Sequence, residues 1–366
     1  MRLLLLSDIN SSHTQKWALG LASAGFQIGV FSLSSANNDW FSEKQIQVFY
    51  FSAINLKVNT HLFMKIRYLR YLKYLKKVIE NFKPDILHAH YATSYGLLGA
   101  LSGFKPLLIS VWGSDVFDFP GKSIFHKSVL RYNLNHAERI YSASNVMAEV
   151  TKKISKKPTY LIPFGVDTDF FHPSDEKKYS GKKITIGTVK ALEKVYGIDI
   201  LIKAFKIIVD HNPELNLKLL IVGGGSQLIY LQKLTEQLLL RDKVTFAGRI
   251  DYKDIPMYYK QIDIFANLSR HESFGVSVLE AMACGKPVVI SAAGGLPELV
   301  NDGETGLIVK PENEKAAVNA FQRLLDDGQL AISLGINARE HVKKKFDWNK
   351  SVEMMMKHYN EILTHT

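Results

Sequence analysis

The fold of this chain is decided by the stretch His271-Glu-Ser-Phe-Gly-Val-Ser-Val-Leu-Glu280-Ala-Met-Ala-Cys-Gly-Lys-Pro-Val-Val289. The run 263–267 before it and the run 287–290 at its end are both rich in apolar residues and read as strands. The residues between them have a helical pattern. Glu272 therefore falls in the turn where a strand feeds a helix, and Glu280 lies about two turns into that helix.

The start of this predicted helix is a natural site for an anion. The backbone N–H groups of Phe274, Gly275 and Val276 fall there, where they have no partner within the helix and the helix dipole is positive. An anion cradle between two carboxylates suits a sugar nucleotide, with the pyrophosphate in the middle and a hydroxyl-bearing group on either side. The alternative is an ordinary amphipathic helix with two solvated glutamates. The glycines and the proline around the stretch favour the ligand site.

The stretch resembles the E-x7-E signature of the retaining glycosyltransferases of family 4. That resemblance implies an α/β chain with the GT-B fold, in which two Rossmann-like, doubly wound domains face a cleft. It also implies that Glu272 is catalytic and contacts hydroxyls of the donor sugar, and that Glu280 holds the ribose diol. Ser273, Phe274, Gly275 and Val276 would bind the donor between them.

Length and charge limit the possible classes of protein. A chain of 366 residues suggests two domains of ordinary size. The formal charge of +11, from 46 basic and 35 acidic residues, favours anionic partners. Zinc-finger spacing and RNA-recognition signatures are not found, so nucleic acid is a weaker choice than a phosphorylated small molecule or an anionic membrane. The single cysteine, Cys284, fits a reducing cytoplasm and reads as a small buried residue.

Alternation of strand-like and helix-like segments predicts two parallel sheets covered by helices. The strands expected in the first half are 2–6, 28–33, 47–51, 85–90, 107–112, 139–143 and 160–162. Those expected in the second half are 184–187, 218–222, 244–246, 263–267, 288–291 and 306–309. We expect an N-terminal acceptor domain at 1–170 and a nucleotide-sugar domain at 171–345. A helix at 346–366 would cross back to the first domain. The polar stretch 169–183 is the linker candidate, and the segment Pro163–Pro173 also resembles the family's interdomain junction.

A second donor element follows the strand at 184–187. Family members usually place an Arg and a Lys here to hold the donor pyrophosphate, whereas this chain has Lys190 and, before the glycine, Tyr196. Lys190 is the candidate for neutralising the leaving diphosphate, a catalytic role, and Lys194 is close enough to bind the donor as well. The alternative is that both lysines are solvated surface charges.

Candidate acceptor residues lie in the N-terminal half. His88 and His90 fall on one face of a strand, with His90 at its carboxyl end as a catalytic candidate and His88 as a core residue. Trp112, where many family members have a histidine, could be a platform for the acceptor sugar. The remaining acceptor candidates are Asp115, His13 and Asn10. The alternatives are that Trp112 fills the core, that Asp115 caps a turn and that His13 is exposed. We expect no metal site and no cofactor.

The segment 62–79 is basic, aromatic and of helical period. The predicted buried stripe is Leu62, Ile66, Leu69, Leu72 and Ile79, and basic residues with Tyr68, Tyr71 and Tyr74 would cover much of the remaining surface. That composition fits a helix lying on anionic lipid. The alternative is a crossover helix of the N-terminal domain with extended lysines.

These observations predict a glycosyltransferase that uses a nucleoside-diphosphate sugar, with UDP favoured, and the family resemblance implies a retaining, metal-independent reaction. By analogy with the family, its acceptor would be a polyprenyl-diphosphate-linked oligosaccharide of surface polysaccharide (O-antigen or capsule) at the inner face of the cytoplasmic membrane. Three alternatives remain. The chain could act on a small metabolite, it could bind a nucleotide or glycan without transfer, or it could bind nucleic acid through the basic helix.

Overall fold

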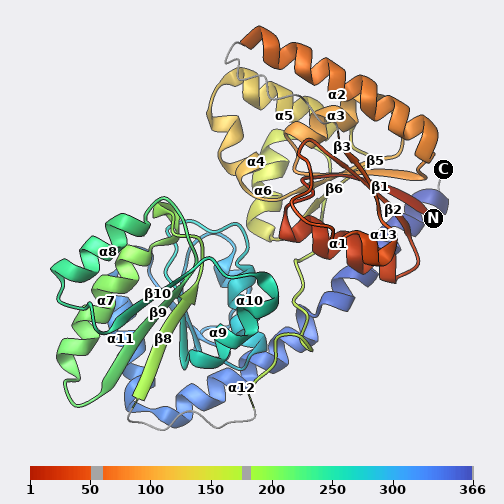
Figure 1. The fold of residues 1–366 in the computed structure, drawn as a ribbon. Coiled ribbons are helices and arrows are strands. Elements are labelled where there is room, and N and C mark those ends of the chain that lie inside the picture. Colours follow the sequence, from red (N-terminus) through yellow and green to blue (C-terminus); the bar gives the residue numbers. More distant parts are fainter. Residues whose placement is uncertain (51–60, 175–182, 365–366) are drawn as a thin grey trace. The chain divides into compact units, whose positions relative to one another are not determined.

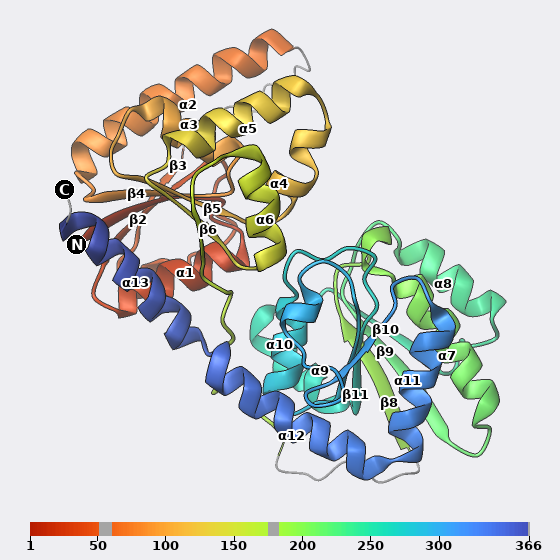
Figure 2. The ribbon, with the colours of Figure 1, turned by 180° about the vertical axis from the view of Figure 1, so that it is seen from behind.

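Short aliphatic runs become the strands of two parallel sheets in the computed structural model (Figures 1 and 2). The structure describes residues 1–50, 61–174 and 183–364, and the side chains of these residues except 61–69. Each predicted strand is present within two residues of its expected bounds. Central parallel strands are covered on both faces and are buried along their length, which is why their runs read as nearly continuous hydrophobic segments.

The first unit comprises Met1–Pro163 together with Ser351–Thr366. Its described part holds a seven-stranded sheet in the order β3-β2-β1-β4-β5-β6-β7. The strands are β1 (Arg2–Leu6), β2 (Gln27–Ser32), β3 (Gln47–Tyr50), β4 (Ile86–His90), β5 (Leu107–Val111), β6 (Arg139–Ser142) and β7 (Thr159–Leu161). Register follows from the buried runs, as in Leu5 opposite Val30 on one side and His88 on the other.

Helices cover both faces of this first sheet. Figures 1 and 2 both show α2, α3 and α5 on one face and α1 with α13 on the other. The helices are α1 (Ser12–Ser23), α2 (His61–Phe82), α3 (Ser94–Ser102), α4 (Ser114–Phe117), α5 (Ile124–His136), α6 (Asn145–Ile154) and α13 (Trp348–Thr364). Because α3 packs against both α2 and α5, these three helices form one layer.

The second unit, Phe164–Lys350, repeats the architecture. Its six-stranded sheet runs β10-β9-β8-β11-β12-β13 among the described residues. The strands are β8 (Lys183–Val189), β9 (Asn216–Val222), β10 (Val244–Gly248), β11 (Ile264–Asn267), β12 (Val288–Ser291) and β13 (Leu307–Val309). The helices are α7 (Ile198–His211), α8 (Leu228–Gln237), α9 (Ile255–Gln261), α10 (Val276–Ala283), α11 (Glu314–Asp326) and α12 (Gly328–Lys345).

Each sheet reverses its strand order once. In the first sheet the chain moves outward from β1 to β3 and then returns to place β4 beside β1. In the second sheet it moves outward from β8 to β10 and returns to place β11 beside β8. The loops that leave the two neighbouring strands of such a switch point diverge, and open α/β sheets bind ligands there.

The chain passes between the units at Pro163, within the junction Pro163–Pro173 that the family resemblance implied, and again at Lys350. It does not cross within the polar stretch 169–183. The reason is local packing. Phe171 lies in that stretch, yet it is fully buried in the second unit, where its ring meets those of Tyr252 and Tyr259. Residues 175–182 of the expected linker lie outside the described part of the chain.

The buried face of α2 differs from the predicted stripe. Tyr71, Leu75, Val78 and Phe82 are buried, and the ring of Tyr74 packs 5.7 Å from that of Phe31. The prediction that Tyr71 and Tyr74 help to cover the outer surface is therefore wrong, and Leu72 and Ile79 are only half-buried. Leu62, Ile66, Leu69 and Tyr68 belong to the part of α2 whose side chains are not described.

The last helix completes the core of the first unit. Tyr359 of α13 is fully buried, and its hydroxyl hydrogen-bonds with Nδ1 of His88 at 2.7 Å. Nε2 of His88 meets Ser110 Oγ at 2.9 Å, so both ring nitrogens are satisfied, and burial lowers the pKa of His88 well below its usual value. At the surface, Arg139 Nη1 donates to Glu361 at 2.7 Å. His88 is thus the core residue that the sequence predicted.

We predict that Tyr359→Phe lowers the free energy of unfolding by about 1–3 kcal/mol, because one ring nitrogen of buried His88 loses its partner. Urea denaturation measures the change. Tyr132→Phe on α5 is the control, since Tyr132 is exposed. Equal stability of the two variants would mean that the buried hydrogen bond contributes nothing.

Candidate functional site

Lys190 and Glu272 lie in the loops that follow β8 and β11, the two neighbouring strands at the switch point of the second sheet. Lys190 follows β8 directly, and Glu272 lies five residues after the end of β11. Their side chains form an ion pair between Nζ and Oε2, and both are largely buried. The ammonium also lies 4.3 Å from the centre of the Tyr196 ring. The structure therefore brings together two of the three predicted catalytic residues.

The turn that carries Glu272 is fixed from two sides. Ser269 Oγ lies 2.6 Å from Asn267 Oδ1 and 3.4 Å from the Glu272 carboxylate. The carbonyl of Glu272 accepts a hydrogen bond from the N–H of Gly295 at 2.9 Å. A Cβ on Gly294, which has φ of 54°, would lie 1.9 Å from that carbonyl oxygen. Only glycine fits at 294, so the 294–295 turn closes against the candidate site.

The predicted donor-binding residues form the start of α10. Phe274 is buried, Gly275 adopts φ of 111° as the residue before the helix, and Ser273 and Val276 are half-buried. The first N–H groups of α10 have no acceptor within the helix. Two further polar atoms are buried nearby without a hydrogen-bond partner among the described residues, Ser277 Oγ and Asn267 Nδ2. Sequence reasoning missed both.

Glu280 lies inside the unit rather than on a solvated helix face. Its Oε2 accepts a hydrogen bond from the hydroxyl of Tyr259 at 2.8 Å, and both residues are buried. Burial, and then the charge of Glu280, raises the pKa of Tyr259 well above its usual value, so the phenol keeps its proton and acts as a donor. This placement removes the alternative of two solvated glutamates on an ordinary surface helix.

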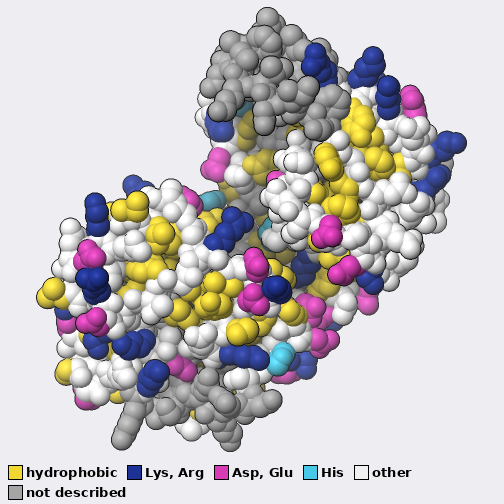
Figure 3. Space-filling view, viewed as in Figure 1, with side chains coloured by type: hydrophobic (Ala, Val, Ile, Leu, Met, Phe, Trp, Pro, Cys, Tyr) yellow, Lys and Arg dark blue, Asp and Glu magenta, His cyan; other side chains and the backbone are white. Residues whose placement is uncertain are grey.

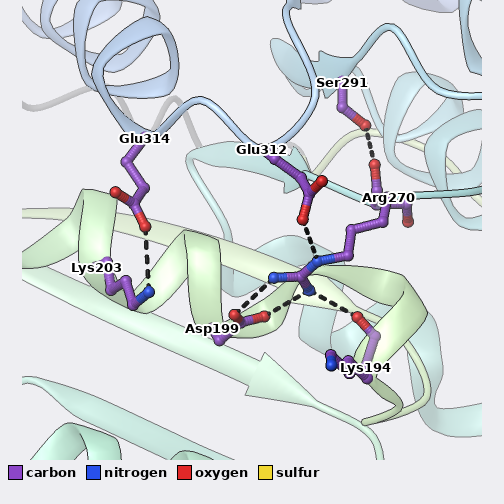
Figure 4. Close-up of polar contacts among 8 residues, drawn as sticks. Lys194, Asp199, Lys203, Arg270, Ser291, Glu312 and Glu314 are labelled. Atoms are coloured by element: carbon purple, nitrogen blue, oxygen red, sulfur yellow. Dashed lines mark hydrogen bonds and ion pairs between the residues drawn. The ribbon is translucent and has the colours of Figure 1, made fainter.

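Lys194 lies in the 3₁₀ turn η3 (Lys194–Tyr196), with an exposed side chain. The group that the structure uses is its carbonyl, which accepts a hydrogen bond from Arg270 Nη1 at 2.7 Å. Figure 4 shows the Arg270 guanidinium between this carbonyl, Asp199 and Glu312. Lys194 therefore does not share the ion pair of Lys190 and Glu272.

Arg270 ties two loops of the site together. Its guanidinium meets both carboxylate oxygens of Asp199 at 2.8 Å, a bidentate pair, and its Nε donates to Glu312 at 2.8 Å (Figure 4). Its backbone N–H donates to the carbonyl of Val195 at 2.8 Å. Burial alone would raise the pKa of Asp199, but the hydrogen bonds and charge of Arg270 outweigh burial and lower it. The turn that carries Tyr196 is thereby held beside the Glu272 loop.

Cys284, at the end of α10, is buried, and burial raises the pKa of its thiol to about 12. A thiol that stays protonated is a poor nucleophile. The structure thus agrees with the prediction that this cysteine fills space.

The acceptor candidates of the first unit gather at its own switch point. His90 ends β4 and is buried, with Nδ1 unpaired among the described residues. Burial, and then the neighbouring His13, lowers the pKa of His90 to about 3, so the ring is neutral at physiological pH. Trp112 packs 5.0 Å from the His90 ring and 5.6 Å from that of His13. The structure therefore brings three of these candidates together.

Two other candidates have structural partners. The Asp115 carboxylate is fully buried and accepts hydrogen bonds from the N–H groups of Ala92, Trp112 and Gly113. This arrangement supports the turn-capping alternative for Asp115. Asn10 donates through Nδ2 to the carbonyl of Ser35 and accepts from the N–H of Asn37. Its amide therefore joins two loops.

Within the part of the chain that the structure describes, His, Cys, Asp and Glu side chains form no group of three or more suited to a metal ion. The same residues contain no helix long and apolar enough to cross a membrane.

Two family models match the chain. The model "Glycosyl transferases group 1" matches residues 171–341, and "Glycosyl transferase 4-like" matches residues 2–144. Together with the two doubly wound units, these matches identify the chain as a glycosyltransferase of the GT-B fold.

Individual relatives are similar over most of the chain. An uncharacterized glycosyltransferase of Methanocaldococcus jannaschii is 29% identical over 78% of each chain. The N-acetyl-alpha-D-glucosaminyl L-malate synthase of Bacillus anthracis is 27% identical over 76% of this chain and 75% of that one. The D-inositol 3-phosphate glycosyltransferase of Corynebacterium jeikeium is 33% identical, over 55% of this chain and 51% of its own length.

Solved structures share the fold over the full length. Sucrose-phosphate synthase from Thermosynechococcus elongatus gives a TM-score of 0.86 at 24% identity and covers 100% of both chains. Anabaena HepE in complex with UDP gives 0.82 at 20% identity, over 99% of this chain and 100% of that one.

We predict that Arg270→Lys lowers the free energy of unfolding by about 1–3 kcal/mol, because a lysine cannot make the bidentate pair and reach the Lys194 carbonyl together. Glu312→Gln is the matched control. It removes only the charge of a largely exposed carboxylate, and its expected cost is below about 1 kcal/mol. Urea denaturation compares the two variants. Equal losses in the free energy of unfolding would mean that the bidentate contacts of the Arg270 guanidinium contribute no extra stability.

Proposed function

We propose that the chain transfers a hexosyl or N-acetylhexosaminyl group from a nucleoside-diphosphate sugar, with retention at the anomeric carbon. The observation that carries the proposal is the buried pair of Lys190 and Glu272, which lies at the switch point of the second sheet and in the loop leading into α10. One group can neutralise a leaving diphosphate and the other can accept hydrogen bonds from sugar hydroxyls. The N–H groups at the start of α10 supply further donors for phosphate oxygens.

In this proposal each residue has a distinct part. Lys190 balances the negative charge that grows on the diphosphate as the glycosidic bond breaks. The acceptor hydroxyl attacks on the same face, and its proton passes to the leaving phosphate. Glu272 positions the sugar and Glu280 the ribose diol. Anabaena HepE was solved with UDP and with UDP-glucose, which supports a UDP-sugar as the donor.

The proposed acceptor is a polyprenyl-diphosphate-linked oligosaccharide of surface polysaccharide, met at the inner face of the cytoplasmic membrane. Charge supports this choice. From Lys44 to Ile79 the sequence contains no Asp or Glu, and Arg70, Lys73, Lys76 and Lys77 of α2 are exposed. Juxtamembrane lysines and arginines attract anionic lipid by about 1 kcal/mol each. The cluster of His90, Trp112 and His13 would receive the acceptor sugar.

The second candidate is transfer to a small soluble acceptor. The names of two relatives favour it, since one is an N-acetyl-alpha-D-glucosaminyl L-malate synthase and the other a D-inositol 3-phosphate glycosyltransferase. Both candidates share the donor site and differ only in what the first unit binds. The third possibility is that this chain binds a nucleotide or glycan without transferring a sugar, which predicts ligand binding without turnover.

A donor screen tests the shared site. We predict that a UDP-sugar raises the thermal midpoint more than GDP- or ADP-sugars, because a ligand stabilises the folded state by mass action.

Glu280→Ala should raise the Kd for the nucleoside diphosphate about 10- to 150-fold, because hydrogen bonds to a charged group are lost. Glu314→Ala is the matched control, because this partly exposed glutamate at the start of α11 pairs with Lys203. Calorimetry showing native affinity in Glu280→Ala would reject the ribose assignment.

Turnover tests the pair. We predict that Lys190→Ala lowers kcat by about 10²- to 10³-fold, since charge on the leaving diphosphate is no longer balanced. Lys194→Ala, with an exposed amine that does not reach Glu272, should retain activity within about threefold of native, the loss of a screened surface charge. Circular dichroism must show that both variants are folded. Comparable activities of the two variants would reject Lys190 as the main diphosphate contact.

A further inference from the structure

The start of α5 exposes two adjacent large apolar side chains. Ile124 is 86% exposed and Phe125 is 69% exposed, whereas the next most exposed large apolar residue described in this unit, Tyr50, is 41% exposed. The packed side of α5 is formed by Leu130, Asn133 and Leu134 further along. The first turn is therefore held as a helix, with the N–H of His126 bonded to Ser123, while its apolar side chains meet no core.

Positive charge surrounds this apolar tip, which we define as Lys122, Ile124, Phe125 and Lys127. Both lysines are exposed. From Phe119 to Ala137 the sequence contains no Asp or Glu, so no carboxylate of this segment balances the lysines or Arg131. Exposed apolar side chains are a solubility liability when they stand alone. Here the flanking lysines keep the tip soluble and attract it to an anionic surface.

The basic face of α2 lies in the same helical layer. α3 packs against both α2 and α5, and Figures 1 and 2 show the start of α5 at the same end of the unit as the start of α2. The buried side of α2 is turned to the core, which leaves Arg70, Lys73, Lys76 and Lys77 outward. In Figure 3, Lys and Arg side chains line the edge of this unit beside the grey residues. The α5 tip and the basic face of α2 therefore lie on the same side of the first unit.

We propose that the α5 tip inserts into the interface of an anionic bilayer, with the basic face of α2 as a second, electrostatic contact. Aliphatic and aromatic side chains enter the boundary between headgroups and acyl chains, and lysines beside them stay with the headgroups. Nucleic acid fits less well, since an exposed isoleucine gains nothing from phosphate. The proposal rests on the proposed function for its purpose, which is to bring the first unit to a lipid-linked acceptor.

Vesicle flotation tests the proposal on the full chain. Wild type should float with phosphatidylcholine vesicles that contain phosphatidylglycerol, less so without phosphatidylglycerol, and less so at high salt. I124S/F125S should weaken partitioning about tenfold or more, since the inserted apolar area is lost. The matched control is I229S/Y230S at the start of α8, which removes a pair 69% and 49% exposed in the second unit and should float as wild type.

Charge and fold are tested in parallel. K122E/K127E should also release the chain from phosphatidylglycerol vesicles, while both tip variants keep the native thermal midpoint because they change only exposed side chains. Failure of wild type to float at low salt, or flotation of I124S/F125S equal to wild type, would overturn the proposal. Equal flotation on vesicles with and without phosphatidylglycerol would overturn its electrostatic part.

A UDP-sugar thermal shift on the same proteins separates this proposal from the proposed function. The tip variants should keep the native donor shift, because the donor site lies in the other unit. A wild type that floats but binds no nucleotide sugar would reject the proposed function and leave the docking surface standing. Normal donor binding without flotation would reject the docking surface and leave the proposed function standing.

Discussion

The placement of β11 directly beside β8 is the constraint on which the donor half of this molecule depends. It follows from the return of the chain after β10, and it makes the loop after β8 and the loop after β11 neighbours although 82 residues separate Lys190 from Glu272. Neither side chain would be buried without the other, because a lone charge in that position lacks a counter-ion. The turn at Gly294 then closes the Glu272 loop, and Arg270 closes the loop of Tyr196.

The sequence was a good guide where physical signals are local. Runs of Leu, Ile and Val predicted the strands because both faces of a parallel sheet are buried, and the spacing of Glu272 and Glu280 placed them at the start and inside of one helix. The prediction for Lys190 combined its position directly after a strand with the cation that the resembled family usually places there. His88 could be assigned to the core for the same reason, since its neighbours on β4 are aliphatic.

Features that depend on distant partners could not be predicted. The carboxylates that hold Arg270 come from residues 42 and 71 positions away, and the Tyr259 hydroxyl that meets Glu280 is 21 residues earlier on another helix. On α2 the error was one of classification. When tyrosine is counted as apolar, Tyr71, Leu75, Val78 and Phe82 form a regular stripe, whereas counting it as polar rotates the predicted face. Tyrosine rings bury readily when the hydroxyl has an exit or a partner.

The return of the chain at Ser351 makes the second unit an insertion within the first. The outgoing and returning segments are bonded to each other, since Val166 pairs with Asp347 and Thr168 Oγ1 donates to the Asp347 carboxylate at 2.8 Å. A fragment that ends at Pro163 would therefore lack Tyr359 and Glu361, and would leave His88 and Arg139 without the groups they meet. Release of the N-terminal unit as an independent protein requires the last helix to be supplied as well, either joined by a new short connection or added as a separate peptide.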